Sequence, residues 1–244
     1  FNLKPDTKEW DFLAKQFEEA YAMKDHLTHV SPRVQNRNLP YTPVAPSDTM
    51  QNEPDTDFDL SQNQEWVRRI FAKWKKSGTE EPEIIPLQIG AETVVCKNRY
   101  KYLDRCQNDE VCICEMSQAD SAQVEKIIEI AETDPAGWRK TTLEERHRIM
   151  YEAANRLADM RGDLIGCMCA VTGKTVIEGD VEVSEAVDYA RFYTTAMKKF
   201  AALDDIEIKP KGTILVISPW NFPCAIPVGG IVAGLAGGNT VILK

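Results

Sequence analysis

The final stretch of the chain, residues 211–244, constrains the fold more than any other: KGTILVISPWNFPCAIPVGGIVAGLAGGNTVILK. Residues 213–217 form an apolar, mostly β-branched run, which is typical of a parallel strand covered on both faces. Two prolines stiffen residues 218–223, and a glycine-rich helix is predicted over 225–236 before a Gly-Gly-Asn stop. A second strand is predicted over 240–243. This order predicts the start of a doubly wound α/β sheet, on which the helix glycines permit close packing.

A group of short strands and four helices is predicted ahead of this unit. Asp120 and Thr142 each stand three residues before a Gln or Glu, the pattern of a capping box that begins a helix. Asp134-Pro135 and Gly173 are expected to end helices. The predicted strands cover 84–89, 92–96 and 111–114, with turns at Gly90-Ala91 and 104–109; the predicted helices follow Asp120, follow Thr142, and cover 163–172 and 177–200. The sequence therefore predicts a small β-flap and a helical layer before the sheet.

Residues 1–60 carry a weaker pattern. Apolar side chains between Trp10 and Met23 recur at helical spacing and predict one amphipathic helix. Five prolines lie between residues 32 and 54, which favours an extended linker over 31–55 that lacks regular structure and is cut first by proteases. A helix is predicted next over 62–75. We therefore divide the chain into an N-terminal helix and linker (1–60), a region of strands and helices (61–210) and a first βαβ unit (211–244).

Composition excludes several classes of function. The formal net charge of −9 and the lack of a basic cluster argue against a nucleic-acid or anionic-membrane partner. The sequence has no apolar run long enough to span a membrane and no secretory leader pattern. Its seven cysteines include no CxxC pair, so free thiols, a reducing cytoplasm and no metal site are expected. Cys112, Cys114, Cys167 and Cys169 are interpreted as small apolar residues, and His26 and His29 as surface residues.

Two runs in the final stretch resemble the start of the cofactor domain of aldehyde dehydrogenases: ISPWNFP at 217–223 and TVILK at 240–244. They occur in that order, separated by the length of one helix. The resemblance implies an NAD cofactor, with Ile217, Ser218, Pro219 and Trp220 lining its cleft and Lys244 hydrogen-bonded to its adenosine ribose. It also implies that Asn221 is catalytic, as a donor to the oxyanion that forms when a thiolate attacks the aldehyde.

The residues taken alone allow plainer interpretations. Asn221 would be a turn residue that satisfies its own backbone, and Lys244 a surface lysine after a strand. Cys224 is close to Asn221, but the resembled family usually has an apolar residue there, so we interpret it as packing. Residues 172–175 end like a phosphate-binding loop without its earlier glycine, which is Met168 here. Residues 229–234 do not match the dinucleotide fingerprint.

A third motif, NEPDTDF at 52–58, resembles the junction before the aldehyde dehydrogenase module of proline utilisation A proteins. Runs at 135–146, 172–175 and 185–193 are also similar to aldehyde dehydrogenases, so the resemblance covers 52–244. In that family an upstream flavin-dependent proline dehydrogenase makes pyrroline-5-carboxylate, which opens to glutamate semialdehyde. Residues 1–51 would be the end of the upstream half or the connector from it. The family's proline-binding arginine pair does not follow Leu39-Pro40-Tyr41, so no flavin site is expected.

The resemblance implies a truncated aldehyde dehydrogenase fold, in the N-terminal part of an NAD-dependent L-glutamate γ-semialdehyde (1-pyrroline-5-carboxylate) dehydrogenase. The implied partners are glutamate semialdehyde as substrate, an upstream proline dehydrogenase domain, and further copies of the intact protein in a homo-oligomer. The family's nucleophilic cysteine and carboxylate base lie downstream of TVILK, so this chain is expected to be inactive alone. The alternative is a non-catalytic scaffold or interaction fragment that binds no cofactor productively.

Overall fold

The computed structural model describes residues 4–28, 30–75, 81–104, 107, 111–205 and 207–244. By its internal contacts the chain divides into two compact units, Phe1–Gln35 and Asn36–Lys244. The first unit contains the predicted amphipathic helix, α1 (Lys8–Ala22), and a short 3-10 helix, η1 (Lys24–His26). No residue of α1 is buried. His26 lies in η1 and is exposed, as predicted, whereas His29 lies outside the described residues.

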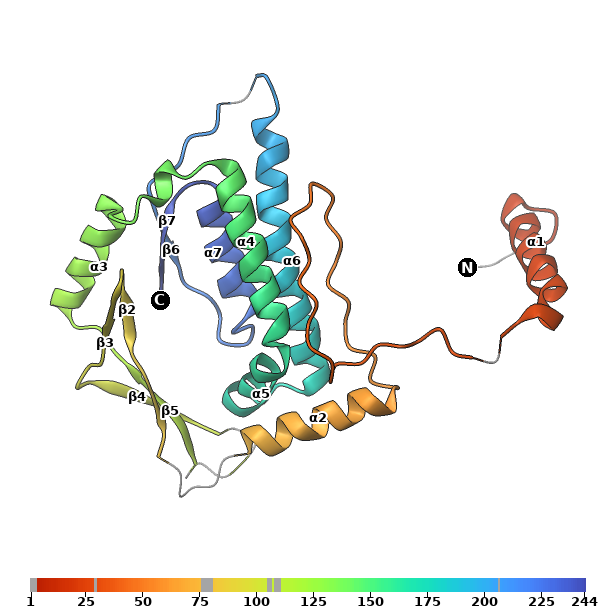
Figure 1. The fold of residues 1–244 in the computed structure, drawn as a ribbon, viewed down its shortest axis with the longest axis horizontal. Coiled ribbons are helices and arrows are strands. Elements are labelled where there is room, and N and C mark those ends of the chain that lie inside the picture. Colours follow the sequence, from red (N-terminus) through yellow and green to blue (C-terminus); the bar gives the residue numbers. More distant parts are fainter. Residues whose placement is uncertain (1–3, 29, 76–80, 105–106, 108–110, 206) are drawn as a thin grey trace. The chain divides into compact units, whose positions relative to one another are not determined.

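The second unit contains the predicted β-flap, but its described residues form five strands where the sequence predicts three (Figure 1). The predicted strand over 84–89 is divided at Pro86, which has no N–H to donate, and a strand over Arg99–Leu103 is not predicted. β1 (Glu83–Ile85) pairs in parallel with β5 (Cys112–Ser117), and β5 pairs antiparallel with β4 (Arg99–Leu103). β2 (Leu87–Ile89) and β3 (Glu92–Val94) form a hairpin, whose turn uses Gly90 at a φ of 59°. Most of the predicted turn at 104–109 lies outside the described residues.

The sequence pattern does not predict β4, because this strand alternates charged and aromatic side chains. Arg99 and Lys101 both form ion pairs with Glu115 of β5, at 3.3 and 3.8 Å between nitrogen and oxygen. The rings of Tyr100 and Tyr102 contact each other edge to face, with 5.0 Å between their centroids. Side-chain pairs of this kind stabilise a strand that lacks an apolar row.

Helices α2 to α6 lie where the sequence predicts them. Their bounds are Ser61–Trp74, Ser121–Thr133, Leu143–Asp159, Arg161–Thr172 and Val176–Ala201. The predicted capping boxes are confirmed, since the side chains of Asp120 and Thr142 accept hydrogen bonds from N–H groups three residues on, at 2.9 and 3.2 Å. The predicted helix ends are confirmed as well, at Asp134 (φ 49°) and Gly173 (φ 73°), both left-handed.

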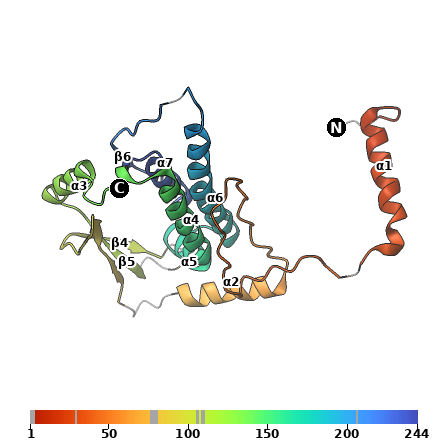
Figure 2. The same cartoon turned by 45° about the horizontal axis from the view of Figure 1, so that its top comes forward.

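Helix α6 is the centre of the second unit. It packs against α4, α5 and α7, and α4 and α6 lie side by side in both ribbon views (Figures 1 and 2). Val183, Ala186, Val187 and Ala190 of α6 are 0% exposed, as is Ala154 of α4. These small side chains let the neighbouring helices approach α6 closely, and they form the centre of the apolar core with residues of α4, α5 and α7.

The predicted βαβ unit is present with the predicted bounds for its helix and second strand. β6 (Thr213–Val216) and β7 (Thr240–Leu243) pair in parallel, and α7 (Ala225–Ala236) connects them. The helix glycines are confirmed as close-packing positions: a Cβ at Gly230 would lie 2.9 Å from Val216, and one at Gly234 would lie 2.8 Å from Val241. Any larger residue at these two positions would push α7 away from the strands.

One expectation about this unit is wrong. The apolar run over 213–217 predicts a strand covered on both faces, but Leu215 is 58% exposed and Ile217 is 62% exposed. Helix α7 packs on the face that carries Val216 and Val241. Helix α3 contacts β7 near Thr240, whose hydroxyl donates to the Ala131 carbonyl at 2.7 Å, but neither helix buries Leu215 or Ile217. The face of β6 opposite α7 is therefore left exposed in this chain.

The proline-rich segment 36–60 has no helix or strand, as predicted, but it is not a free linker. It belongs to the second unit and runs along α4 and α6. The Asn155 side chain of α4 accepts a hydrogen bond from the Val44 N–H at 2.9 Å and donates one to the Val44 carbonyl at 2.9 Å. Asp188 of α6 accepts one from the Glu53 N–H at 2.7 Å. The segment is therefore docked along its length.

Candidate active site

The residues predicted to form the site lie at one edge of the β6–β7 pair. The turn 217–223 follows β6, and Lys244 follows β7. The two strands are parallel and in register, with Val216 opposite Leu243, and the Lys244 N–H donates to the Val216 carbonyl at 3.0 Å. The structure therefore brings Lys244 next to the start of the turn. This is the carboxyl edge of the strands, where open α/β sheets bind their ligands.

Most side chains of the turn face solvent. Trp220 is 78% exposed, and Pro219 and Asn221 are also exposed. Within the described part of the chain, no hydrogen bond uses the side-chain amide of Asn221, so the plainer interpretation of a self-satisfied turn residue finds no support here. Ser218 differs, because its Oγ atom is buried and has no hydrogen-bond partner among the described residues.

The turn is held at its carboxyl end by a buried carboxylate on α6. Glu182 is 1% exposed and accepts hydrogen bonds from the N–H groups of Cys224 and Ala225, at 2.7 and 3.1 Å. These N–H groups belong to the start of α7, which has no side-chain cap of its own. Lys174 forms an ion pair with Glu182, and its Nζ lies 4.0 Å from the centroid of the Phe222 ring. Sequence reasoning noted Lys174 and missed Glu182.

The other end of α7 is held by two residues of the aldehyde-dehydrogenase-like run at 135–146. The Trp138 indole N–H donates to the Leu235 carbonyl at 3.1 Å, and Arg146 donates to the Ala236 carbonyl at 3.3 Å. A carboxylate at the N-terminus and a guanidinium at the C-terminus both complement the helix dipole. Helix α7, and with it the turn, is thus fixed at both ends.

Cys224 is part of the buried core, as predicted for a packing residue. Burial, with a smaller contribution from the negative charge of Glu182, raises the pKa of its thiol to about 12. The thiol is therefore protonated at neutral pH, which makes it a poor nucleophile. Its place beside the turn is explained by packing against α6.

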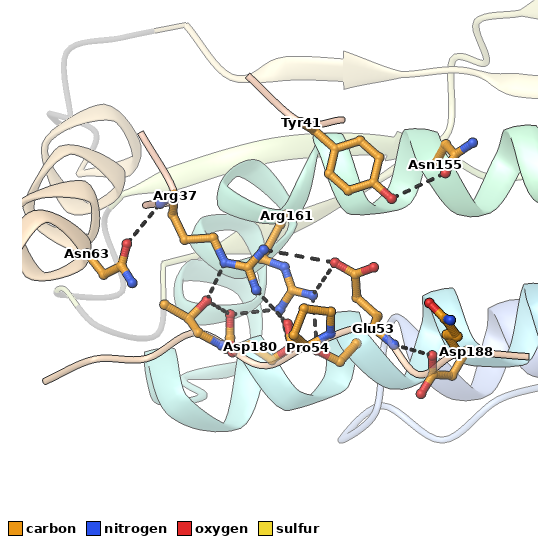
Figure 3. Close-up of polar contacts among 12 residues, drawn as sticks. Arg37, Tyr41, Glu53, Pro54, Asn63, Asn155, Arg161, Asp180 and Asp188 are labelled. Atoms are coloured by element: carbon orange, nitrogen blue, oxygen red, sulfur yellow. Dashed lines mark hydrogen bonds and ion pairs between the residues drawn. The ribbon is translucent and has the colours of Figure 1, made fainter. Parts of the chain in front are cut away.

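A second polar cluster docks the NEPDTDF motif. Glu53 pairs with Arg161 at 3.4 Å and with Arg191 at 3.1 Å, and Asp180 pairs with Arg161 at 2.8 Å (Figure 3). All four side chains are at most 4% exposed. Arg37 extends the cluster by donating to Thr56 at 3.0 Å and to the Pro54 carbonyl at 2.5 Å. We call Arg37, Glu53, Arg161, Asp180 and Arg191 the arginine cluster.

The arginine cluster has partners for its charges and is a structural feature. A surface hollow of about 500 Å³ lies beside it, between residues 50–55 and α6, and contains none of the predicted site residues. Within the described part of the chain, no group of three His, Cys, Asp or Glu residues is placed to hold a metal ion. Among the described helices, none combines the length and apolar composition that crossing a membrane requires.

Known proteins similar to this chain agree with the geometry. The aldehyde dehydrogenase family model matches residues 96–244. The chain is 33% identical over 204 residues to a 1-pyrroline-5-carboxylate dehydrogenase of Geobacillus sp. (strain WCH70), which covers 79% of this chain and 39% of that protein. The structure of the present chain resembles that of 1-pyrroline-5-carboxylate dehydrogenase from Thermus with bound NAD, at a TM-score of 0.73 and 28% identity. The match covers 80% of this chain and 39% of the Thermus chain.

A proline utilization A protein from Corynebacterium freiburgense is also similar, at a TM-score of 0.55 and 27% identity, over 94% of this chain and 18% of that one. The chain spans about two fifths of the length of the curated 1-pyrroline-5-carboxylate dehydrogenases that it matches. The predicted fold class is confirmed, since the α/β architecture of the second unit matches solved aldehyde dehydrogenase structures. The chain belongs to the aldehyde dehydrogenase family.

Proposed function

We propose that the protein containing this chain oxidises L-glutamate γ-semialdehyde, the open form of 1-pyrroline-5-carboxylate, to glutamate with NAD. Two findings support the substrate and the cofactor: the Geobacillus relative is a 1-pyrroline-5-carboxylate dehydrogenase, and the Thermus structure was obtained with NAD. The observation that carries the proposal is the placement of Asn221. Asn221 is exposed, its amide has no hydrogen-bond partner among the described residues, and it lies at the same strand edge as Lys244.

The residues at this edge fit a dinucleotide. The Ser218 Oγ atom is buried and, within the part of the chain that is described, has no hydrogen-bond partner, and Ile217 and Trp220 present apolar surface next to it. Lys244 is exposed and directly follows the last residue of β7. On this proposal, Ile217, Ser218, Pro219 and Trp220 line the cofactor cleft, and Lys244 donates a hydrogen bond to the adenosine ribose. When bound, NAD supplies the hydride acceptor for the oxidation.

Asn221 has the chemistry of an oxyanion donor. Attack of a thiolate on the aldehyde carbon places negative charge on the carbonyl oxygen, and a fixed N–H donor lowers the energy of that state. A side-chain amide in a turn with two flanking prolines, anchored at α7, is such a donor. Cys224 does not serve as the thiolate, because its pKa of about 12 keeps it protonated. We expect the nucleophile and the carboxylate base to come from a part of the protein outside this chain.

We further propose that residues 1–51 belong to the end of an upstream proline dehydrogenase domain or to the connector from it. The similarity to the Corynebacterium freiburgense protein covers 94% of this chain, so it extends beyond the region matched by the Geobacillus relative. In such a protein the upstream domain would supply the substrate of this module. A homo-oligomer of the intact protein is part of the same proposal.

The test is an assay of the full-length protein. NADH formation should be measured with pyrroline-5-carboxylate and, as a control, with propanal, which lacks the amino and carboxylate groups of the substrate. We expect turnover with the first and a far lower kcat/KM with the second. This chain alone should give no turnover. If the full-length protein oxidises neither aldehyde, the proposal is wrong, and the alternative of a non-catalytic scaffold takes its place.

A further inference from the structure

Glu182 and Lys174 form a buried ion pair that the chemistry above does not use. Glu182 is 1% exposed and the Lys174 side chain is 14% exposed. Burying two charges is costly, and such a pair is often no more stabilising than apolar residues of the same size. A role beyond stability is therefore worth seeking in what the pair contacts.

The pair contacts three of the four residues that follow Asn221. Glu182 Oε1 accepts from the N–H groups of Cys224 and Ala225, and the Lys174 ammonium lies over the ring of Phe222. Glu182 thereby takes the place of an N-cap for α7, since Cys224 offers no side-chain hydrogen bond there. At the other end of the turn, the backbone is held by β7 through Lys244 and Val216. The turn is thus fixed on both sides of Asn221.

We propose that Glu182 and Lys174 are positioning residues, which hold the turn so that the Asn221 amide points at the reacting carbonyl oxygen. This inference rests on the proposed function. A catalytic donor is effective only when it is held within about 0.5 Å of its working geometry. Lys174 fixes the ring of Phe222, the residue after Asn221. Glu182 fixes the backbone of Cys224 and Ala225 at the start of α7. Neither side chain touches the substrate.

The first test measures the anchor directly and does not depend on any activity. Hydrogen exchange of the full-length protein should be followed on the peptide that covers residues 219–228. We expect Glu182→Ala to speed the exchange of the Cys224 and Ala225 amides at least tenfold, because both lose their acceptor. Glu182→Gln keeps a side-chain oxygen for both amides and should restore most of the protection. Unchanged exchange at these amides in Glu182→Ala would overturn the proposal.

The second test measures the consequence for catalysis. Glu182→Gln removes the charge that holds Lys174 over Phe222, and we expect kcat to fall about tenfold with the KM for NAD unchanged. Glu152→Gln is the matched control: it too removes a carboxylate from an ion pair, here with Arg156 at 3.2 Å, but on the exposed side of α4. This control should keep the full rate. A fall in kcat equal to that of Glu182→Gln would show a general effect of charge and would contradict a positioning role.

A double-mutant cycle separates positioning from simple support of the fold. If Glu182 acts through Asn221, then Glu182→Gln should cost almost nothing further once Asn221 is alanine. Additive losses would mean that Glu182 acts elsewhere, and would overturn the inference. If the wild-type protein oxidises no aldehyde, the proposed function fails by itself. The exchange measurement then still decides whether Glu182 anchors the turn.

Discussion

Two segments of the second unit have no helix or strand, and they are held in opposite ways. The docked segment 36–60 and the turn 217–224 both contain prolines, which limit the freedom of the unfolded chain. The first buries its polar side chains among charged partners, with Glu53 and Thr56 each 7% exposed. The second exposes Trp220 and Asn221 and is held mainly through its backbone.

The difference shows how one irregular segment is used for docking while the other keeps its side chains available to a ligand. Segment 36–60 gives its side chains to the arginine cluster, so none of those groups is left to bind a ligand. The turn gives only backbone N–H groups to Glu182, so its side chains stay available. Proline content alone does not distinguish the two. What distinguishes them is that segment 36–60 gives buried polar side chains, as well as backbone groups, to its anchoring contacts, whereas the polar contacts of the turn use its backbone.

The largest expected effect is a difference in the rate at which trypsin cuts the native protein after two nearby arginines, Arg33 and Arg37. Arg33 is exposed and lies in the first unit, whereas Arg37 donates from its backbone N–H to Asn63 at 2.8 Å and from its side chain to Thr56 and Pro54. Trypsin should therefore cut after Arg33 in the native protein. Cutting after Arg37 requires the docked segment to leave the unit, an opening that approaches the global unfolding free energy of about 5–15 kcal/mol.

The cut sites are read by mass spectrometry of short digests of the full-length protein. The sequence alone placed the first cuts anywhere over 31–55, and the docking narrows this to the part before residue 36. Equal rates of cutting after Arg33 and Arg37 would mean that the docked segment detaches readily, and the contrast between the two irregular segments would not hold.

The second effect concerns the free energy of unfolding. Arg161→Ala removes the donor to Asp180 and Glu53 and leaves the Asp180 carboxylate without the guanidinium 2.8 Å away, in a region where these side chains are at most 4% exposed. Breaking a buried pair in this way costs about 3–5 kcal/mol. Arg148→Ala is the matched control, since that arginine is 65% exposed and pairs with Glu152 at 4.0 Å, and it should cost less than about 1 kcal/mol. Urea unfolding of the two variants should show this order.

The third effect falls on the rate of oxidation. Asn221→Ala should slow the chemical step about a hundredfold, or about 3 kcal/mol, because the amide is needed most when the oxyanion forms. Lys244→Ala should instead weaken NAD binding and largely spare the rate at saturating cofactor. Single-turnover kinetics of the full-length variants separate the two effects. A full rate of acylation in Asn221→Ala would return this residue to the role of an ordinary turn residue.

Much of the fold could be predicted because its signals are local. Each capping box, at Asp120 and at Thr142, lies within four consecutive residues, and the end of α5 depends on the single residue Gly173. The bounds of α7 follow from the prolines before it and the glycines after it. The edge of the β6–β7 pair could be predicted too, since two parallel strands joined by one helix must end on the same side.

The arginine cluster and Glu182 could not be predicted in the same way. Charged residues in a helix are ordinarily assigned to its solvated face, and Asp180, Glu182 and Arg191 of α6 gave no local sign of burial. Their partners are distant in sequence: Glu53 is 138 residues from Arg191 and Cys224 is 42 residues from Glu182. The open face of β6 was mispredicted for a related reason, because an apolar run indicates a capacity for burial and not the presence of a cover.

The smallest expected effect is the loss of unfolding free energy in Tyr41→Phe. It tests whether ion pairs or hydroxyl hydrogen bonds contribute more to holding the docked segment. The Tyr41 hydroxyl donates to Asn155 at 3.2 Å and accepts from Arg191 at 3.1 Å. Both partners keep another contact in Tyr41→Phe, because Asn155 still accepts from the Val44 N–H and Arg191 still pairs with Glu53. The loss should therefore be about 1 kcal/mol. A loss as large as that of Arg161→Ala would show that the hydroxyl contacts outweigh the charges.

The same variant carries a pH test with a definite sign. Burial, followed by the negative charge of Glu53, raises the pKa of Tyr41 above its ordinary value of 10.0. The folded protein then binds more protons at this residue than the unfolded chain does as the pH rises past 10, so this contribution to stability is present below pH 10 and is lost above it. The wild type should lose stability with rising pH more steeply than Tyr41→Phe over this interval. Urea unfolding at pH 8 and at pH 10.5 compares the slopes, and parallel slopes would mean that the Tyr41 hydroxyl is hydrated and the docked segment is looser at this point than its hydrogen bonds indicate.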